Sequence, residues 1–217
     1  MLVKLRNGRM KTLVAGLLKE KNYDRLIEMA GEKRSVIRYL FSLLYDQDDL
    51  IRWRAVEATG LVVGALAAEN QEAARDIVRR LFWLLNEESG GIGWSAPQAI
   101  GEIIKSRPDL FGEYIAILLS SLDDPAFTAG VLWAVGRIGG QRPELVKNAV
   151  PVILPLLGHV DPAVRGHAAW ALGIIGTECE KDRLEPLRSD TALFHLYTEG
   201  EIRKKTVGEI VVEAVGK

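Results

Sequence analysis

Cysteine is almost absent from this sequence of 217 residues, in which Cys179 is the only one. A single cysteine excludes an intramolecular disulfide framework and a cysteine-based zinc site, and it fits a reducing cytoplasm. Histidine is scarce as well: His159, His167 and His195 share neither an i,i+4 pairing nor the spacing of metal ligands. We therefore expect no metal ion and no cofactor, with His167 serving as a packing residue.

Long apolar runs and a strong excess of charge are also missing. No run approaches the roughly 20 apolar residues that a membrane-spanning helix needs, so no membrane partner is expected. The short apolar run at residues 12–18 is closed by charges and lacks a cleavage site, so it predicts an amphipathic helix rather than a signal peptide. The net charge of −1 does not favour nucleic acid. Residues 1–38 hold ten Lys/Arg against four Asp/Glu, which leaves open a basic landing patch or a solvated helix face.

An internal repeat is present instead. Four segments align on a glycine that follows a small-apolar stretch, at Gly60, Gly101, Gly136 and Gly173, and their spacing is close to the length of a helix–turn–helix repeat. A turn-forming stretch precedes each segment, and a second stretch with helical periodicity precedes each turn. These earlier stretches are residues 36–45, 73–85, 111–122 and 145–157. The sequence therefore predicts four helical pairs.

The two ends depart from the repeat, as capping elements do. Residues 9–32 predict an extra helix pair. Residues 194–197 alternate like a strand and face residues 202–205 across Glu199-Gly200, which predicts a β-hairpin. Thr206-Val207-Gly208-Glu209 then has the pattern of a capping box that opens a last helix.

The segment DPAVRGHAAWALGIIG, residues 161–176, resembles the second helix of short bacterial HEAT repeats, also seen in proteins of the phycobilisome-lyase type. Residues 48–64 match nearly as well. This resemblance implies an all-α, right-handed α-α superhelix, a HEAT-like solenoid, with a small C-terminal β-hairpin and a capping helix. We expect one domain over residues 1–217, with capping helices at 1–34, four helical-pair repeats at 35–178 and a C-terminal cap at 179–217.

A helical wheel divides the segment at 161–177 into two sides. Its buried stripe is expected to hold Val164, Ala168, Ala171, Leu172 and Ile175. Trp170 falls on the opposite side, together with Gly166 and Gly173. In a solenoid of helical pairs, that side of the second helix lines the concave surface, so Trp170 is expected to project into a groove.

The aligned glycines carry this register to the other repeats. Trp133 is equivalent to Trp170, while Trp53 and Trp94 lie one helical turn earlier. The candidate binding residues are Trp53, Glu57, Trp94, Gln98, Glu102, Trp133, Arg137 and Trp170. Tryptophans that only fill the gaps between neighbouring helices are the alternative. Trp94 differs from the other three tryptophans. Ser95-Ala96-Pro97-Gln98 looks like a capping box with Ser95 as the N-cap, which would place Trp94 before the helix.

The expected function is that of a non-enzymatic interaction module, which binds a protein or peptide segment, or a small ligand, in a Trp-lined groove. The chain is similar in its repeats to HEAT-like DNA glycosylases, which implies a nucleic-acid alternative using Trp133, Trp170, Arg137 and Glu57 or Glu102. The absence of a basic middle region counts against it. A groove that handles a phycobilin chromophore is a further alternative, implied by the repeats alone.

Overall fold

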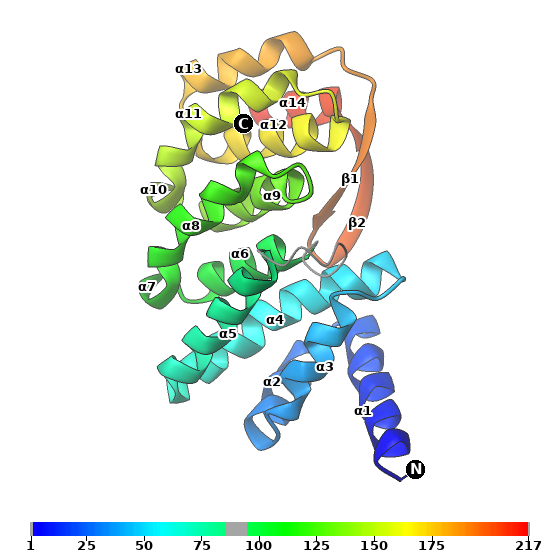
Figure 1. The fold of residues 1–217 in the computed structure, drawn as a ribbon. Helices are drawn as coiled ribbons and strands as arrows, with labels where there is room; N and C mark the ends of the chain where they lie inside the picture. Colours follow the sequence, from blue (N-terminus) through cyan, green and yellow to red (C-terminus); the bar gives the residue numbers. More distant parts are fainter. Residues whose placement is uncertain (1, 86–94, 217) are drawn as a thin grey trace. The chain divides into compact units, whose positions relative to one another are not determined.

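The chain forms two compact units, Met1–Arg107 and Pro108–Lys217. The computed structural model describes residues 2–85 and 95–216, and Figure 1 shows its helices and its one hairpin. Among the described residues, no helix combines the length and apolar character that crossing a membrane requires. The grouping of residues 1–217 into one domain stays a prediction.

The first unit is entirely helical where it is described. Its helices are α1 (Leu2–Lys19), α2 (Tyr23–Glu32), α3 (Ser35–Leu43), α4 (Asp49–Glu69), α5 (Gln71–Leu85) and α6 (Ala96–Ser106). Helix α4 is central, because α1, α2, α3, α5 and α6 all pack against it. It begins where the Asp48 carboxylate accepts hydrogen bonds from the backbone N–H groups of Leu50 and Ile51, at 3.0 and 3.2 Å. These are two of the donors that a helix start leaves without a partner.

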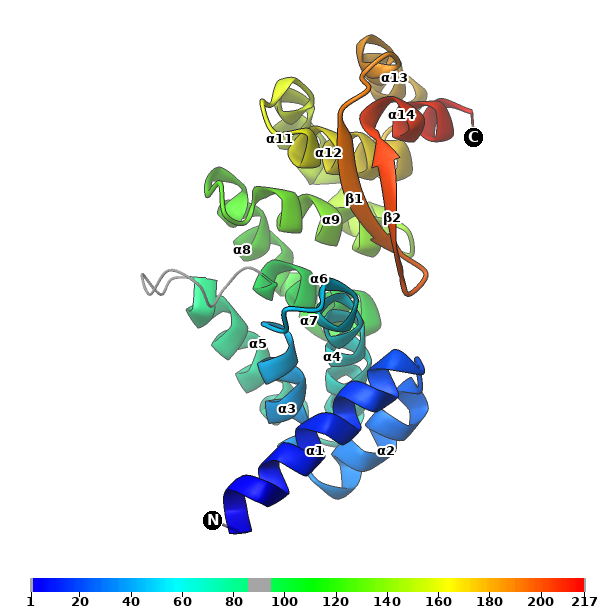
Figure 2. The same ribbon diagram turned by 90° about the vertical axis from the view of Figure 1, so that its right-hand side faces the viewer.

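The second unit is built from shorter helical pieces and the hairpin. They are α7 (Pro108–Phe111), η1 (Gly112–Tyr114), α8 (Ile115–Leu119), η2 (Ser120–Asp123), α9 (Thr128–Gly139), α10 (Pro143–Val146), η3 (Lys147–Ala149), α11 (Val150–Ile153), η4 (Leu154–Gly158), α12 (Pro162–Ile175), α13 (Glu178–Lys181), η5 (Asp182–Leu187), β1 (Leu193–Thr198), β2 (Glu201–Thr206) and α14 (Val207–Val215), where η marks a 3-10 helix. Helix α12 packs on α9, and Figure 2 shows the hairpin and α14 beside α12.

Two predicted helices are interrupted in this unit. The stretch at 145–157 contains Pro151 and Pro155, which have no N–H to donate to the preceding turn, and it folds as a series of short α and 3-10 turns. The stretch at 111–122 breaks in the same way at Gly112, a residue of low helix propensity. Several of the pieces still carry buried apolar side chains, such as Leu118 of α8 and Ile153 of α11.

The hairpin and its following helix are confirmed. Strands β1 and β2 are antiparallel, with Thr198 opposite Glu201, and the two turn residues Glu199 and Gly200 both have positive φ, as a two-residue hairpin turn requires. Thr206 and Glu209 form the expected capping box at the start of α14. The hydrogen bonds from the Thr206 backbone and hydroxyl lower the pKa of Glu209.

Candidate functional site

Metal-ligating side chains do not gather at one place in the part of the chain that the structure describes. Over residues 2–85 and 95–216, no three His, Cys, Asp or Glu side chains lie close enough together to hold a metal ion. Cys179 is exposed. The first unit contains a cavity that is the candidate site.

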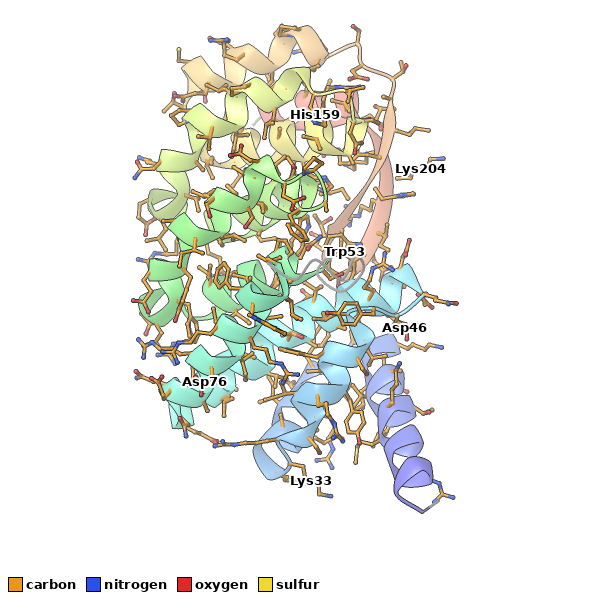
Figure 3. All side chains as sticks on the ribbon, in the orientation of Figure 1. Lys33, Asp46, Trp53, Asp76, His159 and Lys204 are labelled. Carbon is orange, nitrogen blue, oxygen red and sulfur yellow. The ribbon has the colours of Figure 1, made fainter. Side chains whose placement is uncertain are left out.

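This cavity, the Trp53 pocket, has a volume of about 520 Å³. It lies between the end of α3, the turn into α4, the first two turns of α4 and the start of α6. Its lining residues are Leu44, Tyr45, Asp46, Gln47, Asp49, Arg52, Trp53, Ser95 and Gln98. Figure 3 labels Trp53 and Asp46 in this part of the unit. Trp53 and Gln98, both predicted from the repeat register, thus line the same pocket.

The turn between α3 and α4 positions the charged wall of the pocket. Asp48 caps α4, which places Arg52 and Trp53 one turn into the helix. The Arg52 guanidinium donates to the Asp46 backbone carbonyl at 3.0 Å and to the Asp49 carboxylate at 2.6 Å. The Asp46 carboxylate accepts the backbone N–H of Asp48 at 3.2 Å and forms no ion pair with any described residue. The wall therefore carries one carboxylate that no described cation neutralises.

The start of α6 forms the opposite wall. Ser95 occupies the N-cap position, but the predicted capping box is wrong because the Ser95 side chain makes no capping hydrogen bond. Pro97 removes one of the N–H groups that an N-cap residue binds, and the Ser95 backbone (φ −103°, ψ 4°) does not take the extended conformation of such a residue. The Gln98 Oε1 atom is buried and has no hydrogen-bond partner among the described residues.

The other predicted residues of the first unit make internal contacts. The Glu57 carboxylate accepts a hydrogen bond from the Tyr23 hydroxyl at 2.8 Å, which ties α4 to α2. Glu102 is buried and pairs with Lys105 at 3.0 Å between Nζ and Oε2. Trp94 lies outside the described residues. The partner-binding roles assigned to Glu57, Glu102 and Trp94 stay predictions.

In the second unit, the expected exposure of Trp133 is wrong. Its ring is 0% exposed, and its Nε1–H donates to the Tyr197 carbonyl at 2.9 Å. The Tyr197 ring lies against it, with centroids 6.3 Å apart, and the Arg137 guanidinium lies 5.3 Å from the Trp133 ring centroid. The hairpin therefore covers the side of α9 that the helical wheel left open. Because Trp133 is buried, its ring is not exposed for the nucleic-acid contact that the similarity to HEAT-like DNA glycosylases implies.

Trp170 is partly buried, and it packs against an aligned glycine of the preceding repeat. A Cβ atom added at Gly136 would lie 2.3 Å from Cζ3 of the Trp170 ring. The expected open floor around Trp170 is covered as well, since a Cβ at Gly166 would meet the Phe194 ring of β1 and one at Gly173 would meet Ala214 of α14. For this repeat the structure matches the alternative in which the tryptophan packs between neighbouring helices.

The buried stripe predicted for α12 is confirmed. Val164, Ala168, Ala171, Leu172 and Ile175 are all buried. The opposite side of α12 is covered in part as well: α9, η4, β1 and α14 all pack on this helix, and Trp170 and Gly173 are half-buried.

His167 belongs to this packing, as expected. Its ring is 5% exposed, meets the Phe194 ring edge-on at 5.2 Å between centroids, and lies with Nδ1 2.7 Å from the Ala163 carbonyl. Nδ1–H is therefore the donor, and the buried Nε2 has no partner among the described residues. Burial lowers the pKa of His167 to about 4 against a weaker opposing effect of the Ala163 carbonyl, so the ring is neutral near pH 7.

Sequence reasoning missed most of the lining of the Trp53 pocket. Tyr45, Asp46 and Asp49 lie in or beside a stretch that was interpreted only as a turn and helix cap. Their signal was the density of carboxylates directly before Trp53, at residues 46–49, which exceeds the single acid that capping needs.

The comparisons with known proteins agree with this architecture. The family model for HEAT repeats matches residues 113–193. Two engineered proteins, crystallised by the Northeast Structural Genomics Consortium, are similar in structure. One is 20% identical, with 94% of this chain and 95% of that chain covered and a TM-score of 0.52. The other is 20% identical, with 98% and 59% covered and a TM-score of 0.50.

A HEAT-like repeats protein from the archaeon Thermococcus onnurineus NA1 is 16% identical, with 94% of this chain and 78% of that chain covered and a TM-score of 0.43. None of the curated proteins is similar enough in sequence to match the chain. At these identities the likeness to solved structures concerns the fold alone.

Proposed function

Because the chain is a HEAT-like repeat protein, we propose that it is a non-enzymatic interaction module that binds a segment of a partner protein at the Trp53 pocket. The observation that carries this proposal is the pocket itself, with a large aromatic side chain and polar groups converging on one cavity. Its volume of about 520 Å³ lies within the range of cavities that hold ligands or anchoring side chains.

The composition of the pocket supports a protein partner. Interaction hot spots are rich in Trp, Tyr and Arg, and Trp53, Tyr45 and Arg52 line the pocket together. The Tyr45 side chain is 39% exposed, so a partner segment can reach the rim without any rearrangement of the core. Arg52 is held in place by Asp49 and the Asp46 carbonyl, which lowers the entropic cost of binding.

The anchoring residue proposed here differs from those of the Trp-lined groove that the sequence predicts. Trp53 is the anchor and Gln98 the neighbouring polar group, whereas the burial of Trp133 argues against an anchoring role for that ring. Partner contacts by Trp170 and Arg137 stay predictions. We infer a cytoplasmic setting, since the single free cysteine fits a reducing compartment.

Site-specific crosslinking tests the proposal. A photo-crosslinking amino acid placed at Tyr45 should capture a discrete partner in extracts of the source cell, and the same group at Val160, which is 88% exposed in the second unit, should not capture it. The substitution Trp53→Leu should remove the crosslink at Tyr45 by taking away the anchor. Equal capture with and without the Trp53 ring, in a variant with unchanged circular dichroism, would contradict the proposal.

A further inference from the structure

The charged groups that the described residues contribute to the Trp53 pocket are two carboxylates and one guanidinium. The carboxylates belong to Asp46 and Asp49, and that of Asp46 forms no ion pair with any described residue. Among the described lining residues the one cation is Arg52, which already donates to Asp49 and to the Asp46 carbonyl. With two carboxylates and one guanidinium, the lining has a formal charge of −1. A ligand that supplies positive charge and N–H donors would complement it.

The Trp53 ring favours a flat cation. Cations bind over the face of an indole, and a guanidinium also stacks on it. Arginine offers five N–H donors in a planar fork, it stays charged at all working pH values, and it loses hydration more readily than an ammonium. On these grounds we propose that the Trp53 pocket takes an arginine side chain of the partner segment. This inference rests on the proposed function and specifies its partner.

Peptide titrations followed by nuclear magnetic resonance test this inference on the full chain. The probe is an acetylated and amidated pentapeptide with one arginine between serine and glycine residues, and its two analogues carry citrulline or lysine instead. The Trp53 indole N–H signal, assigned as the one lost in Trp53→Leu, should shift with the arginine peptide. The Trp133 indole signal, from a ring buried under the hairpin, is the internal reference and should stay in place.

The analogues and variants separate charge from shape. Citrulline keeps the shape of arginine but lacks its charge, and its peptide should bind about tenfold more weakly. Asp46→Asn should weaken the binding of the arginine peptide about three- to fivefold. The matched control is Asp76→Asn, which removes an exposed carboxylate of α5 that Figure 3 places away from Trp53. This control should leave the affinity unchanged.

Two results would overturn the arginine assignment: equal binding of the arginine and citrulline peptides, or equal losses in Asp46→Asn and Asp76→Asn. A failed titration combined with a Trp53-dependent crosslink at Tyr45 would reject arginine and leave the proposed function standing. A successful titration without a Trp53-dependent crosslink would leave the arginine assignment standing and reject the proposed function, because the pocket would then bind arginine without holding a partner segment.

Discussion

The contact between Gly136 and Trp170 decides whether the substitution Gly136→Ala raises or lowers the free energy of unfolding. In the substitution Gly136→Ala, the new Cβ would lie 2.3, 2.6 and 2.9 Å from Cζ3, Cε3 and Cη2 of the Trp170 ring. Favourable carbon–carbon contacts lie at about 3.5–4.0 Å. The ring or helix α12 must therefore move by roughly 1 Å.

Two effects oppose one another at this position. Alanine is the better helix former in the interior of α9 and should stabilise it by about 1 kcal/mol. Overpacking of a close contact costs about 1–3 kcal/mol, and a rigid ring places this case in the upper half of that range. We expect Gly136→Ala to lower the free energy of unfolding by about 1–2 kcal/mol.

Urea unfolding followed by circular dichroism measures this change, and a double-mutant cycle identifies its cause. In the background Trp170→Leu the ring is gone, so Gly136→Ala should become neutral or stabilising by up to about 1 kcal/mol. The reasoning is refuted if Gly136→Ala stabilises the protein that retains Trp170, or if its cost persists unchanged in the Trp170→Leu background.

Three further predictions concern the second unit. The pKa of His167 is about 4 in the folded protein and about 6.5 when unfolded, so the folded state disfavours the imidazolium. The free energy of unfolding should be unaffected by this group above pH 6.5 and should fall by about 3 kcal/mol as the pH drops from 6.5 to 4. In urea unfolding of His167→Gln over the same pH range, this dependence of the free energy on pH should be absent. Leu172→Ala, in the fully buried stripe, should cost about 2–4 kcal/mol by thermal or urea unfolding. Trp133→Phe should cost about 2–4 kcal/mol, because it leaves the Tyr197 carbonyl without its donor and opens a void; a cost below 0.5 kcal/mol would contradict the packing described for that ring.

The elements that the sequence predicts well are those whose signals are local. These are the buried stripe of α12 from Val164 to Ile175, the turn at Glu199-Gly200 and the capping box at Thr206, and each depends on residues that lie close together in the sequence. Such signals survive in any tertiary context that forms the same element. The breaks in the shorter helices were missed because apolar periodicity outweighed Pro151 and Pro155 in the sequence interpretation.

The error at Trp133 has a different cause. A helical wheel divides a helix into a side that faces its partner and a side that does not, but it cannot identify what later packs on the second side. Tyr197 supplies that cover for Trp133 from a hairpin far along the chain. Phe194 of the same hairpin covers α12 at Gly166. Only part of the Trp53 pocket could be predicted, for a related reason. Trp53 and Gln98 follow from the repeat register. Tyr45 and Asp46 lie at a turn between helices, where the repeat register predicts no binding residue.

The hydrogen bond from Trp133 to Tyr197 joins residues that are 64 positions apart in the chain, and this affects the order of folding during synthesis. All contacts described for α4, α5 and α6 arise within the first 107 residues, so that unit can reach its native packing while the remainder is still being translated. Helix α9 cannot do so, because the carbonyl that its tryptophan binds belongs to Tyr197 of β1, which is made only after α12. Until then a large indole ring is exposed on the nascent chain, which makes this interval the period in which chaperone binding or misassociation is most expected.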